Sequence, residues 1–408
     1  MFNTLPENEI RAWLRLALEN GVGPAKARTL LAAVGPPQDV FAASARVLSG
    51  LVGADLGRQL RQRPQPAMTA AIDAALRWLA EPGHHVLTLA DPRYPSVLLD
   101  THDPPILLYV QGDPAMLSRP GIAVVGARNA SPGGMEHAAA FSCFLARRGW
   151  CVVSGLASGI DAGAHEGALS AGPRAAGTVA VLGTGIDVVY PPRNRDLARR
   201  IAREGALVSE FPLGAKALTH HFPRRNRIVA GMTHGVLVVE AAKQSGSLIT
   251  ARLALDAGRE VFAIPGSIQS PLARGCHALI RQGAKLVESG RDILDELGAG
   301  MTMQDAQDGH AMRGDTHPRS RPHPRRQACV IDDRNAQPLA VAPHPDLQTV
   351  LDAMGHDPIH VDLILRRTAL AVPVLNSRLA QLELDDHIVR LADGRLQRRM
   401  RSAACLSR

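Results

Sequence analysis

From residue 121 onward, short apolar runs rich in β-branched residues alternate with longer amphipathic stretches. Uninterrupted apolar runs are typical of strands buried on both faces, and their alternation with helices indicates a parallel sheet covered by helices. Gly149, Gly205, Gly258 and Gly283 follow predicted helices, where glycine accepts a left-handed backbone conformation. We therefore expect a Rossmann-like α/β core over residues 121–297. Its predicted strands are Ile122–Val125, Cys151–Ser154, Thr178–Leu182, Leu207–Ser209, Val236–Glu240, Val261–Ile264 and Lys285–Val287.

Before this core, residues 5–80 have the pattern of several short helices. Gly21-Val-Gly23 precedes one of them, as in the turn of a helix-hairpin-helix, whose backbone N–H groups can hold one DNA phosphate. An ordinary tight turn in a small helical domain explains the same residues, and both interpretations stay open. Residues 85–120 form a lead-in with one predicted strand at 106–111.

After the core, residues 299–345 are rich in His, Pro, Arg, Asp and Gln, a composition that cannot bury enough apolar surface to fold. The apolar pattern returns with predicted helices at 347–354, 359–366 and 373–384, followed by a hairpin around Asp393-Gly394. Three helices and a hairpin indicate a winged helix, a module that often reads DNA with its third helix. That helix is weakly basic here, so contact with DNA and contact with protein both stay open.

The predicted architecture is therefore an α/β protein in four parts. Residues 1–84 form a small helical domain of the SAM/helix-hairpin-helix type, and residues 85–298 form the Rossmann-like domain. A flexible linker follows at 299–345, and a winged-helix domain occupies 346–400.

The composition indicates a basic protein and a reducing compartment. The chain of 408 residues has a net charge of +8, and residues 121–300 carry most of it, with 20 basic and 14 acidic side chains. This excess fits a polyanion partner such as nucleic acid, although an Arg-rich soluble protein would show it too. The five cysteines are odd in number and lack a CxxC pair, as expected of thiols in a reducing cytoplasm. With no apolar leader and no long apolar run, we expect a cytoplasmic protein without a membrane span.

The residues that follow each predicted strand carry the candidate chemistry, because ligands of parallel sheets bind at the carboxyl ends of the strands. Gly126–Pro132 offers Arg128 as an anion ligand. Ser154–His165 is rich in small residues, so its backbone N–H groups could form an anion nest, with Asp161 as a helix cap and His165 in a structural role. Ser245–Ser247 predicts another nest before a helix, next to the charge of Lys243.

The sharpest feature is the run Arg224–Arg227 immediately before a predicted helix that starts at Ile228. Arginines at a helix start oppose the helix dipole, so anion binding explains them better than helix stability. One of them could instead pair with Glu210 or Glu240. Phe222 either stacks on a base or anchors the loop in the core.

Motifs for nucleotide chemistry are missing from these loops. The sequence has neither the Gly-x-Gly-x-x-Gly fingerprint with its acid nor a Walker A motif. No loop offers a nucleophile next to a histidine base, and no paired carboxylates stand out. The interpretation is binding without catalysis, with no cofactor and no metal.

Four motifs taken together resemble the DNA-processing protein A (Smf) family, and they are Val124–Arg128, Ser154–Asp161, His221–Arg227 and Gln244–Thr250. The resemblance implies a dimeric protein that binds single-stranded DNA through the Rossmann-like domain. It further implies loading of recombinase A onto DNA that displaces single-strand binding protein, in natural transformation, without established enzymatic activity. Thr219 stands where some relatives have a lysine, three residues before the Phe. With Lys243 added for its charge, the predicted DNA contacts are Arg128, Ser154, Gly155, Ser158, Gly159, Phe222, Arg225, Asn226, Arg227, Lys243, Ser245, Gly246, Ser247 and Thr250.

Two other functions remain open at this stage. One is a nucleotide N-glycosidase of the lysine-decarboxylase-like group, which shares the Rossmann type but has a catalytic Glu after its glycine-rich loop; Ala242–Ser247 lacks that acid. The other is a small-nucleotide sensor that uses the winged helix as its output.

Overall fold

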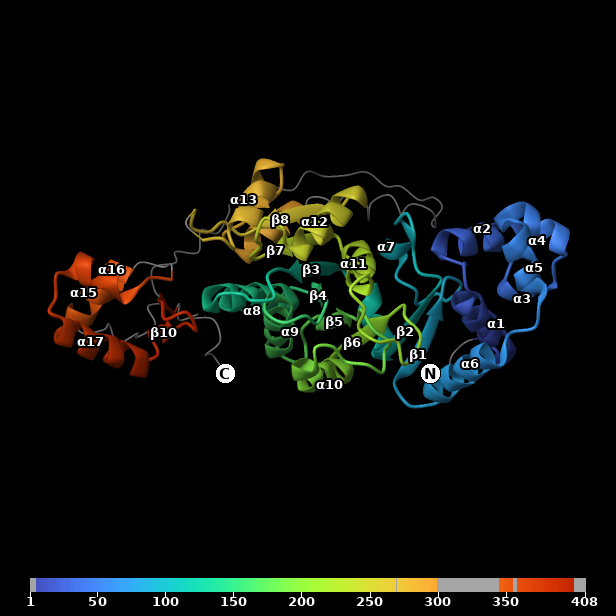
Figure 1. Cartoon of the computed structure of the whole chain (residues 1–408), viewed down its shortest axis with the longest axis horizontal. Coiled ribbons are helices and arrows are strands. Elements are labelled where there is room, and N and C mark those ends of the chain that lie inside the picture. The colour runs from blue at the N-terminus through green and yellow to red at the C-terminus, as the bar shows by residue number, and fades with distance from the viewer. Residues whose placement is uncertain (1–4, 269, 299–344, 355–357, 400–408) are drawn as a thin grey trace, which may run out of the picture. The chain divides into compact units, whose positions relative to one another are not determined.

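A computed structural model describes residues 5–268, 270–298, 345–354 and 358–399 (Figure 1). The chain divides into two compact units, 1–293 and 294–408. The predicted linker at 299–345 lies almost wholly outside the described residues.

The first unit is built on a nine-stranded sheet with the order β1-β2-β6-β5-β4-β3-β7-β8-β9. The neighbours from β6 to β9 pair in parallel, and β2 pairs antiparallel with both β1 and β6. The strands are β1 (His84–Thr88), β2 (Leu107–Gly112), β3 (Gly121–Val125), β4 (Cys151–Ser154), β5 (Thr178–Val181), β6 (Ala206–Ser209), β7 (Gly235–Val238), β8 (Glu260–Ala263) and β9 (Lys285–Leu286).

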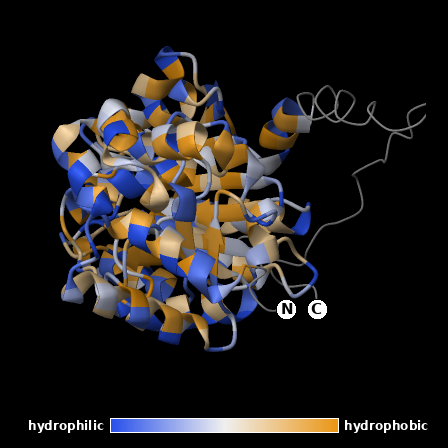
Figure 2. Cartoon of the chain, turned by 90° about the vertical axis from the view of Figure 1, so that its right-hand side faces the viewer, coloured by the Kyte–Doolittle hydropathy of each residue, from blue (hydrophilic) through white to orange (hydrophobic). Residues whose placement is uncertain are grey.

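Helices cover both faces of this sheet. On one face α11, α12 and α13 share a core with the inward residues of the central strands, and on the other face α9, α10 and the N-terminal helices do so. In Figure 2 the strands in the middle are mostly apolar and the polar residues gather on the outer helices. The helices are α1 (Glu7–Leu18), α2 (Pro24–Val34), α3 (Pro37–Ala42), α4 (Ala45–Val52), α5 (Ala54–Arg61), α6 (Pro66–Leu79), α7 (Ser96–Leu99), α8 (Pro132–Arg147), α9 (Ile160–Ser170), α10 (Arg195–Glu204), α11 (His221–Gly231), α12 (Gly246–Asp256) and α13 (Arg274–Arg281), with the short 3-10 helices η1 (Pro114–Ser118) and η2 (Pro192–Asn194).

The strand order places a switch point beside β3. From this strand the chain adds β4, β5 and β6 on one side and then returns to add β7, β8 and β9 on the other. Parallel sheets bind ligands outside the carboxyl ends of their strands at such a point, because the loops there diverge and leave a crevice. The predicted Rossmann-like architecture is confirmed, and it gathers the loops after β3, β4, β5, β6 and β7 at one edge.

The apolar pattern located the strands within one or two residues, with one omission. β1 was not predicted; it begins with two histidines and is an edge strand, which the pattern of a buried strand does not cover. Gly149, Gly258 and Gly283 have positive φ as expected. The expectation for Gly205 is wrong, because its φ is −155° and a side chain there would lie 2.2 Å from the carbonyl oxygen of Thr178.

The N-terminal helices pack on the sheet and share its core. Trp78 at the end of α6 stacks on His84 with 4.2 Å between ring centroids and meets Tyr109 of β2 edge-on at 5.8 Å. One continuous apolar cluster therefore runs from α1 to β2, β6 and α10. The boundary between residues 84 and 85 stays a prediction from the sequence.

The second unit contains the elements expected of a winged helix. α15 (Pro345–Met354), α16 (Val361–Thr368) and α17 (Val372–Leu384) surround a small apolar core, and β10 (Ile388–Arg390) pairs antiparallel with β11 (Leu396–Arg398). Asp393-Gly394 forms the turn of this hairpin, with Gly394 at a φ of +82°. None of the described helices in either unit is long and apolar enough to cross a membrane.

His165 lies in the first unit with no exposed surface, and a structural role explains it. Thr178 donates its hydroxyl proton to the carbonyl oxygen of Val152 at 2.6 Å, so Nδ1 of His165 must donate to the Thr178 oxygen, 2.7 Å away. Nε2 then has no partner among the described residues. Burial, with the charge of Arg225 adding to it, lowers the pKa of His165 to about 3.

This environment predicts a pH-dependent loss of stability. Between pH 6.5 and about 3 the unfolded chain holds a proton on His165 that the folded chain does not, so stability falls as pH falls, by about 1.4 kcal/mol per pH unit. The variant His165→Gln should lack this component, so that its urea-unfolding free energy approaches that of the wild type as the pH drops. The control is His102→Gln, which removes an exposed histidine and keeps the buried one. Parallel pH profiles for wild type and His165→Gln would contradict the assignment.

Candidate nucleic-acid interface

A cavity of about 500 Å³ opens at the carboxyl edge of the sheet, beside the switch point. We call it the strand-end cavity. The loops after β3, β4, β5 and β7 and the start of α11 contribute to it. Of the predicted contacts, those that line it are Arg128, Gly155, Phe222, Arg225, Asn226, Ser245, Gly246, Ser247 and Thr250.

The remaining predicted contacts lie outside this lining. Ser154 is fully buried and donates its hydroxyl to the carbonyl oxygen of Val124 at 2.6 Å. Arg227 is held in an ion-pair network, and Lys243 is exposed beyond the rim. The two others, Ser158 and Gly159, are half-buried in the loop between β4 and α9.

The loop between β4 and α9 already contains an anion of its own. The carboxylate of Asp161 accepts the backbone N–H groups of Gly155 at 3.1 Å and Ala157 at 3.2 Å. These N–H groups were expected to form a nest for a ligand phosphate, and the structure corrects that expectation, because both point to Asp161. Asp161 was expected to cap a helix. It lies instead in the first turn of α9 and holds the preceding loop through these two hydrogen bonds.

Arg225 supplies the cation next to that carboxylate. It is 4% exposed, and its guanidinium donates to the carbonyl oxygens of Gly155 and Val181, at the ends of β4 and β5. Burial lowers the pKa of Arg225 to about 10, while the charge of Asp161 opposes that shift. Burial also raises the pKa of Asp161, and Arg225 opposes it. A side chain at Gly155 would lie 2.3 Å from the guanidinium, so this glycine makes room for Arg225.

The arginine run lies inside a helix and does not precede one. α11 begins at His221, seven residues before the predicted start. Pro223 is its third residue, where the missing backbone N–H costs nothing because the first turn has no acceptor for it. Successive arginines on a helix point in different directions, and the three here therefore face different surroundings.

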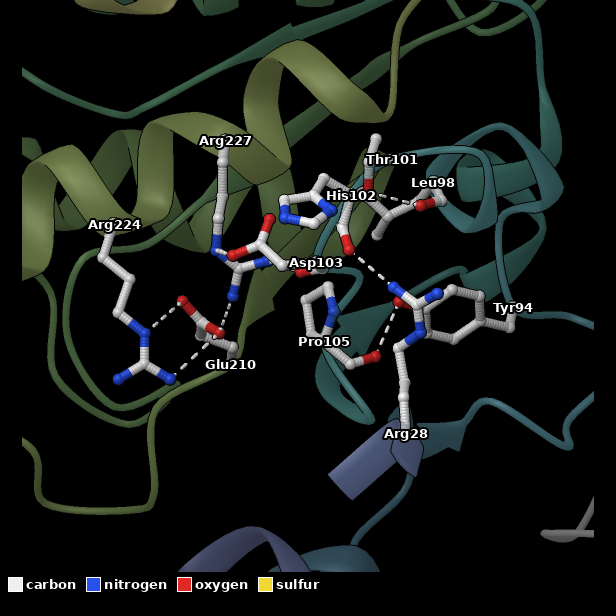
Figure 3. A network of polar contacts seen from close by, with 10 residues as sticks. All are labelled: Arg28, Tyr94, Leu98, Thr101, His102, Asp103, Pro105, Glu210, Arg224 and Arg227. Atoms are coloured by element: carbon white, nitrogen blue, oxygen red, sulfur yellow. Dashed lines mark hydrogen bonds and ion pairs between the residues drawn. The ribbon is translucent and has the colours of Figure 1, made fainter. Parts of the chain in front are cut away.

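Arg224 and Arg227 both pair with Glu210, which follows β6 (Figure 3). Nε of Arg224 lies 3.1 Å from Glu210, and Nε of Arg227 lies 3.4 Å from the carboxylate of Asp103. The Glu210 side chain is only 3% exposed, and burial raises its pKa while the two arginines oppose the shift. The prediction that one arginine pairs with Glu210 is confirmed, and it holds for two of them.

Glu240, the other acid considered as an arginine partner, has a different role. It follows β7 and accepts the backbone N–H of Ser131 at 2.9 Å and the Ser131 hydroxyl at 2.5 Å. Ser131 in turn caps α8 by accepting the N–H of Gly134 at 3.0 Å. The loops after β3 and β7 are thereby fixed to each other across the switch point.

Arg128 and two aromatic rings form the wall of the strand-end cavity. The exposed Arg128 guanidinium lies 5.3 Å from the centre of the half-buried Phe222 ring, and the Tyr190 ring lies 5.6 Å from the same ring. Arg128 has no hydrogen bond or ion pair with any described residue. Phe222 thus contacts Tyr190 and also lines the cavity, and its stacking on a base stays a prediction. Sequence reasoning missed Tyr190, although it is one of only three tyrosines and follows a predicted strand.

The start of α12 also lines the cavity. Ser245 caps the helix by accepting the N–H of Ser247 at 3.3 Å, and the two hydroxyls lie 2.7 Å apart. A side chain at Gly246 would meet nothing within 4 Å, so no packing within the protein requires a glycine there. The helix N-terminus therefore presents its backbone to open space, where an anion can approach closely.

Comparisons with known proteins agree with this geometry. The sequence profile of the family described as "DNA recombination-mediator protein A" matches residues 85–298, and that of the "DprA winged helix domain" matches 334–394. The chain belongs to the DNA recombination-mediator protein A family. It is 39% identical over 326 residues to Protein Smf of Escherichia coli, covering 79% of this chain and 80% of that protein.

Other members of the recombination-mediator family extend the match. The chain is 46% identical over 210 residues to "DNA processing protein DprA" of Streptococcus pneumoniae, covering 52% of this chain and 73% of that protein. The X-ray structure of the pneumococcal protein superposes with a TM-score of 0.61 at 36% identity, covering 72% of this chain and 99% of that one. The resemblance inferred from four motifs is thus confirmed over most of the chain.

The buried arginine predicts a large effect on stability. Arg225→Met removes the cation beside Asp161 and the donor to two strand ends, so we expect a loss of about 3–5 kcal/mol in the free energy of unfolding. Arg224→Met removes a half-exposed partner of Glu210 and should cost no more than about 1 kcal/mol. Urea titrations of both variants test the contrast. Equal losses would show that Arg225 has no special structural role.

Proposed function

We propose that this member of the recombination-mediator family binds single-stranded DNA in the strand-end cavity and loads recombinase A onto it. The observation that carries the proposal is one cavity lined both by Arg128, Phe222 and Tyr190 and by the open N-terminus of α12. An exposed cation and a helix N-terminus suit a phosphate, and an aromatic face suits a base. The cavity offers both within the reach of one nucleotide.

A single strand fits this arrangement better than a duplex. Bases stack on aromatic side chains only when they are free of their neighbours, and stacking contributes without regard to base identity. The cavity of about 500 Å³ can take an unstacked base, whereas a duplex would have to remain at its rim. Binding should therefore tolerate any sequence and weaken as salt rises.

Catalysis is disfavoured by the chemistry of the lining. Among the described residues that line the strand-end cavity, Asp161 is the one acid, and its carboxylate is bound by two backbone N–H groups beside Arg225. A general base must reach the substrate, and this buried carboxylate instead holds its own loop through Oδ2. The proposal is therefore a binding protein, and the N-glycosidase remains the competing function.

The contacts we propose for DNA follow from exposure to the cavity. Arg128, Phe222, Asn226 and the Ser245–Thr250 segment are offered to a ligand. Ser154, Arg225 and Arg227 shape the site from within, and charge reversal at either arginine would bury a carboxylate beside Asp161 or Glu210. Such variants would report on folding rather than on DNA binding. Ser158, Gly159 and Lys243 stay predicted contacts of the rim.

The wider role rests on the family. Its description as a recombination mediator supports transfer of the strand to recombinase A in place of single-strand binding protein. The proposal also includes a homodimer, a cytoplasmic location and a role in natural transformation. For the winged helix, α17 exposes Val372, Val374 and Leu384, which favours protein contact over DNA contact.

The cavity wall predicts which substitutions weaken DNA binding. Phe222→Ala should cost about 1–3 kcal/mol of binding free energy through lost stacking. Arg128→Ala should weaken binding and lower the slope of log affinity against log salt by about 0.7, the contribution of one single-strand phosphate. The matched control is Arg147→Ala, an exposed arginine at the far end of α8. Fluorescence anisotropy with labelled oligothymidine at several salt concentrations measures all three.

Wild-type affinity in both cavity variants would contradict the proposed site. An equal loss in Arg147→Ala would show that general charge, and no particular cavity, holds the strand.

The competing enzyme and sensor functions predict different results with mononucleotides. A binding protein should release no free base from AMP, and AMP should compete with oligothymidine only at concentrations far above those at which DNA binds. Base release, followed by chromatography, would establish the N-glycosidase. Saturable AMP binding that excludes DNA would establish the sensor.

Recombinase loading can be tested on DNA coated with single-strand binding protein. Wild-type protein should shorten the lag before recombinase A forms filaments, and Phe222→Ala should lose this effect in proportion to its DNA affinity. An unchanged lag with a wild type that binds DNA would reject the loading role alone.

A further inference from the structure

A second and larger cavity lies on the flank of α10, outside the site described above. It measures about 690 Å³ and runs between α10 and the ends of β1, β2 and β6. Arg195, Arg199 and Arg203 line it. They are spaced four residues apart and thus form one row along the helix, with roughly 6 Å of rise between neighbours. We call this cavity the arginine groove.

The arginine row is largely free of partners within the protein. Arg195 and Arg203 are exposed and have no hydrogen bond or ion pair with any described residue. Arg199 contacts Asp196 at 2.8 Å, but both side chains are highly exposed, and such pairs are weak. The acid in the groove, Asp187, is engaged with the backbone N–H of Gly214 at 2.8 Å. The groove therefore presents net positive charge, with three arginines and one aspartate in its lining.

The arginine groove begins where the strand-end cavity stops. Asp187, Val188 and Val189 line the groove, and Tyr190, the next residue, lines the strand-end cavity. Because α10 connects two parallel strands, it runs antiparallel to them, and its arginine row leads from the carboxyl edge toward the opposite edge. Its spacing is close to the separation of consecutive phosphates in an extended single strand.

We propose that the arginine groove carries the DNA strand onward after it leaves the strand-end cavity. The three arginines would each meet a phosphate, and the aliphatic floor of Val188, Val189 and Leu207 would contact sugars and base edges. None of the described residues that line the groove is aromatic, so the groove follows the backbone and does not stack bases. This inference rests on the proposed function of the strand-end cavity and extends its footprint.

A series of oligothymidines of increasing length tests the inference. Wild-type affinity should rise with length until both cavities are filled. The triple variant Arg195→Ala/Arg199→Ala/Arg203→Ala should bind the shortest oligomers like the wild type and lose the gain with length, about tenfold or more at low salt. For long oligomers its salt slope should fall by about 2, since each single-strand phosphate contributes about 0.7.

The matched control replaces three exposed arginines of the N-terminal helical region, Arg46, Arg58 and Arg63, by alanine and should keep the full length dependence. A triple lysine variant of the row should keep the salt slope.

Unchanged affinity of the triple alanine variant for long oligomers would overturn the inference and leave the proposed function intact, whereas a wild type that binds no oligomer would reject the proposed function itself. If the triple alanine variant loses binding to oligoglutamate but binds DNA like the wild type, the groove is a site for acidic peptides, and this result would also overturn the inference.

Discussion

The strand-end edge depends on a pair of buried opposite charges, Arg225 and Asp161. Either charge alone would be costly to bury; each is held by hydrogen bonds to the backbone, and the charge of each opposes the pKa shift that burial causes in the other. Arg225 fixes the ends of β4 and β5, while Asp161 fixes the loop that leaves β4. The cavity floor is therefore rigid before any ligand arrives, which reduces the ordering cost of binding. Glycine at position 155 is a consequence of this pair.

The sequence predicted the sheet well because buried parallel strands are uninterrupted apolar runs. It also predicted the place of the site, since topology alone brings the loops after β3, β4 and β7 to one edge. It indicated that one arginine could pair with Glu210 or Glu240, but it could not predict which arginines face Glu210. Arg227, for example, has two acidic partners, Glu210 and Asp103. They lie 17 and 124 residues away from it along the chain, and only the folded structure makes them neighbours.

The arginines divide into two classes that composition cannot distinguish. In the most conspicuous run, Arg224–Arg227, the arginines bind carboxylates and carbonyl oxygens of the protein itself. The exposed positive charge comes instead from Arg128 and from the spaced arginines of α10. A net charge or a basic motif therefore overstates the surface available to a polyanion wherever acids from distant segments converge on it. Burial and pairing decide which cations face outward.

The loop at residues 101–105 is held from two sides (Figure 3). Arg28 of α2 donates to the carbonyl oxygen of His102 at 2.5 Å, and Arg227 of α11 donates to the carbonyl oxygen of Asp103. α11 also carries Phe222 into the strand-end cavity. Hydrogen bonds on both sides of this loop thus connect the N-terminal helices with the helix that carries Phe222. A displacement of α2 would therefore be passed through the loop at residues 101–105 and through α11 to the Phe222 ring.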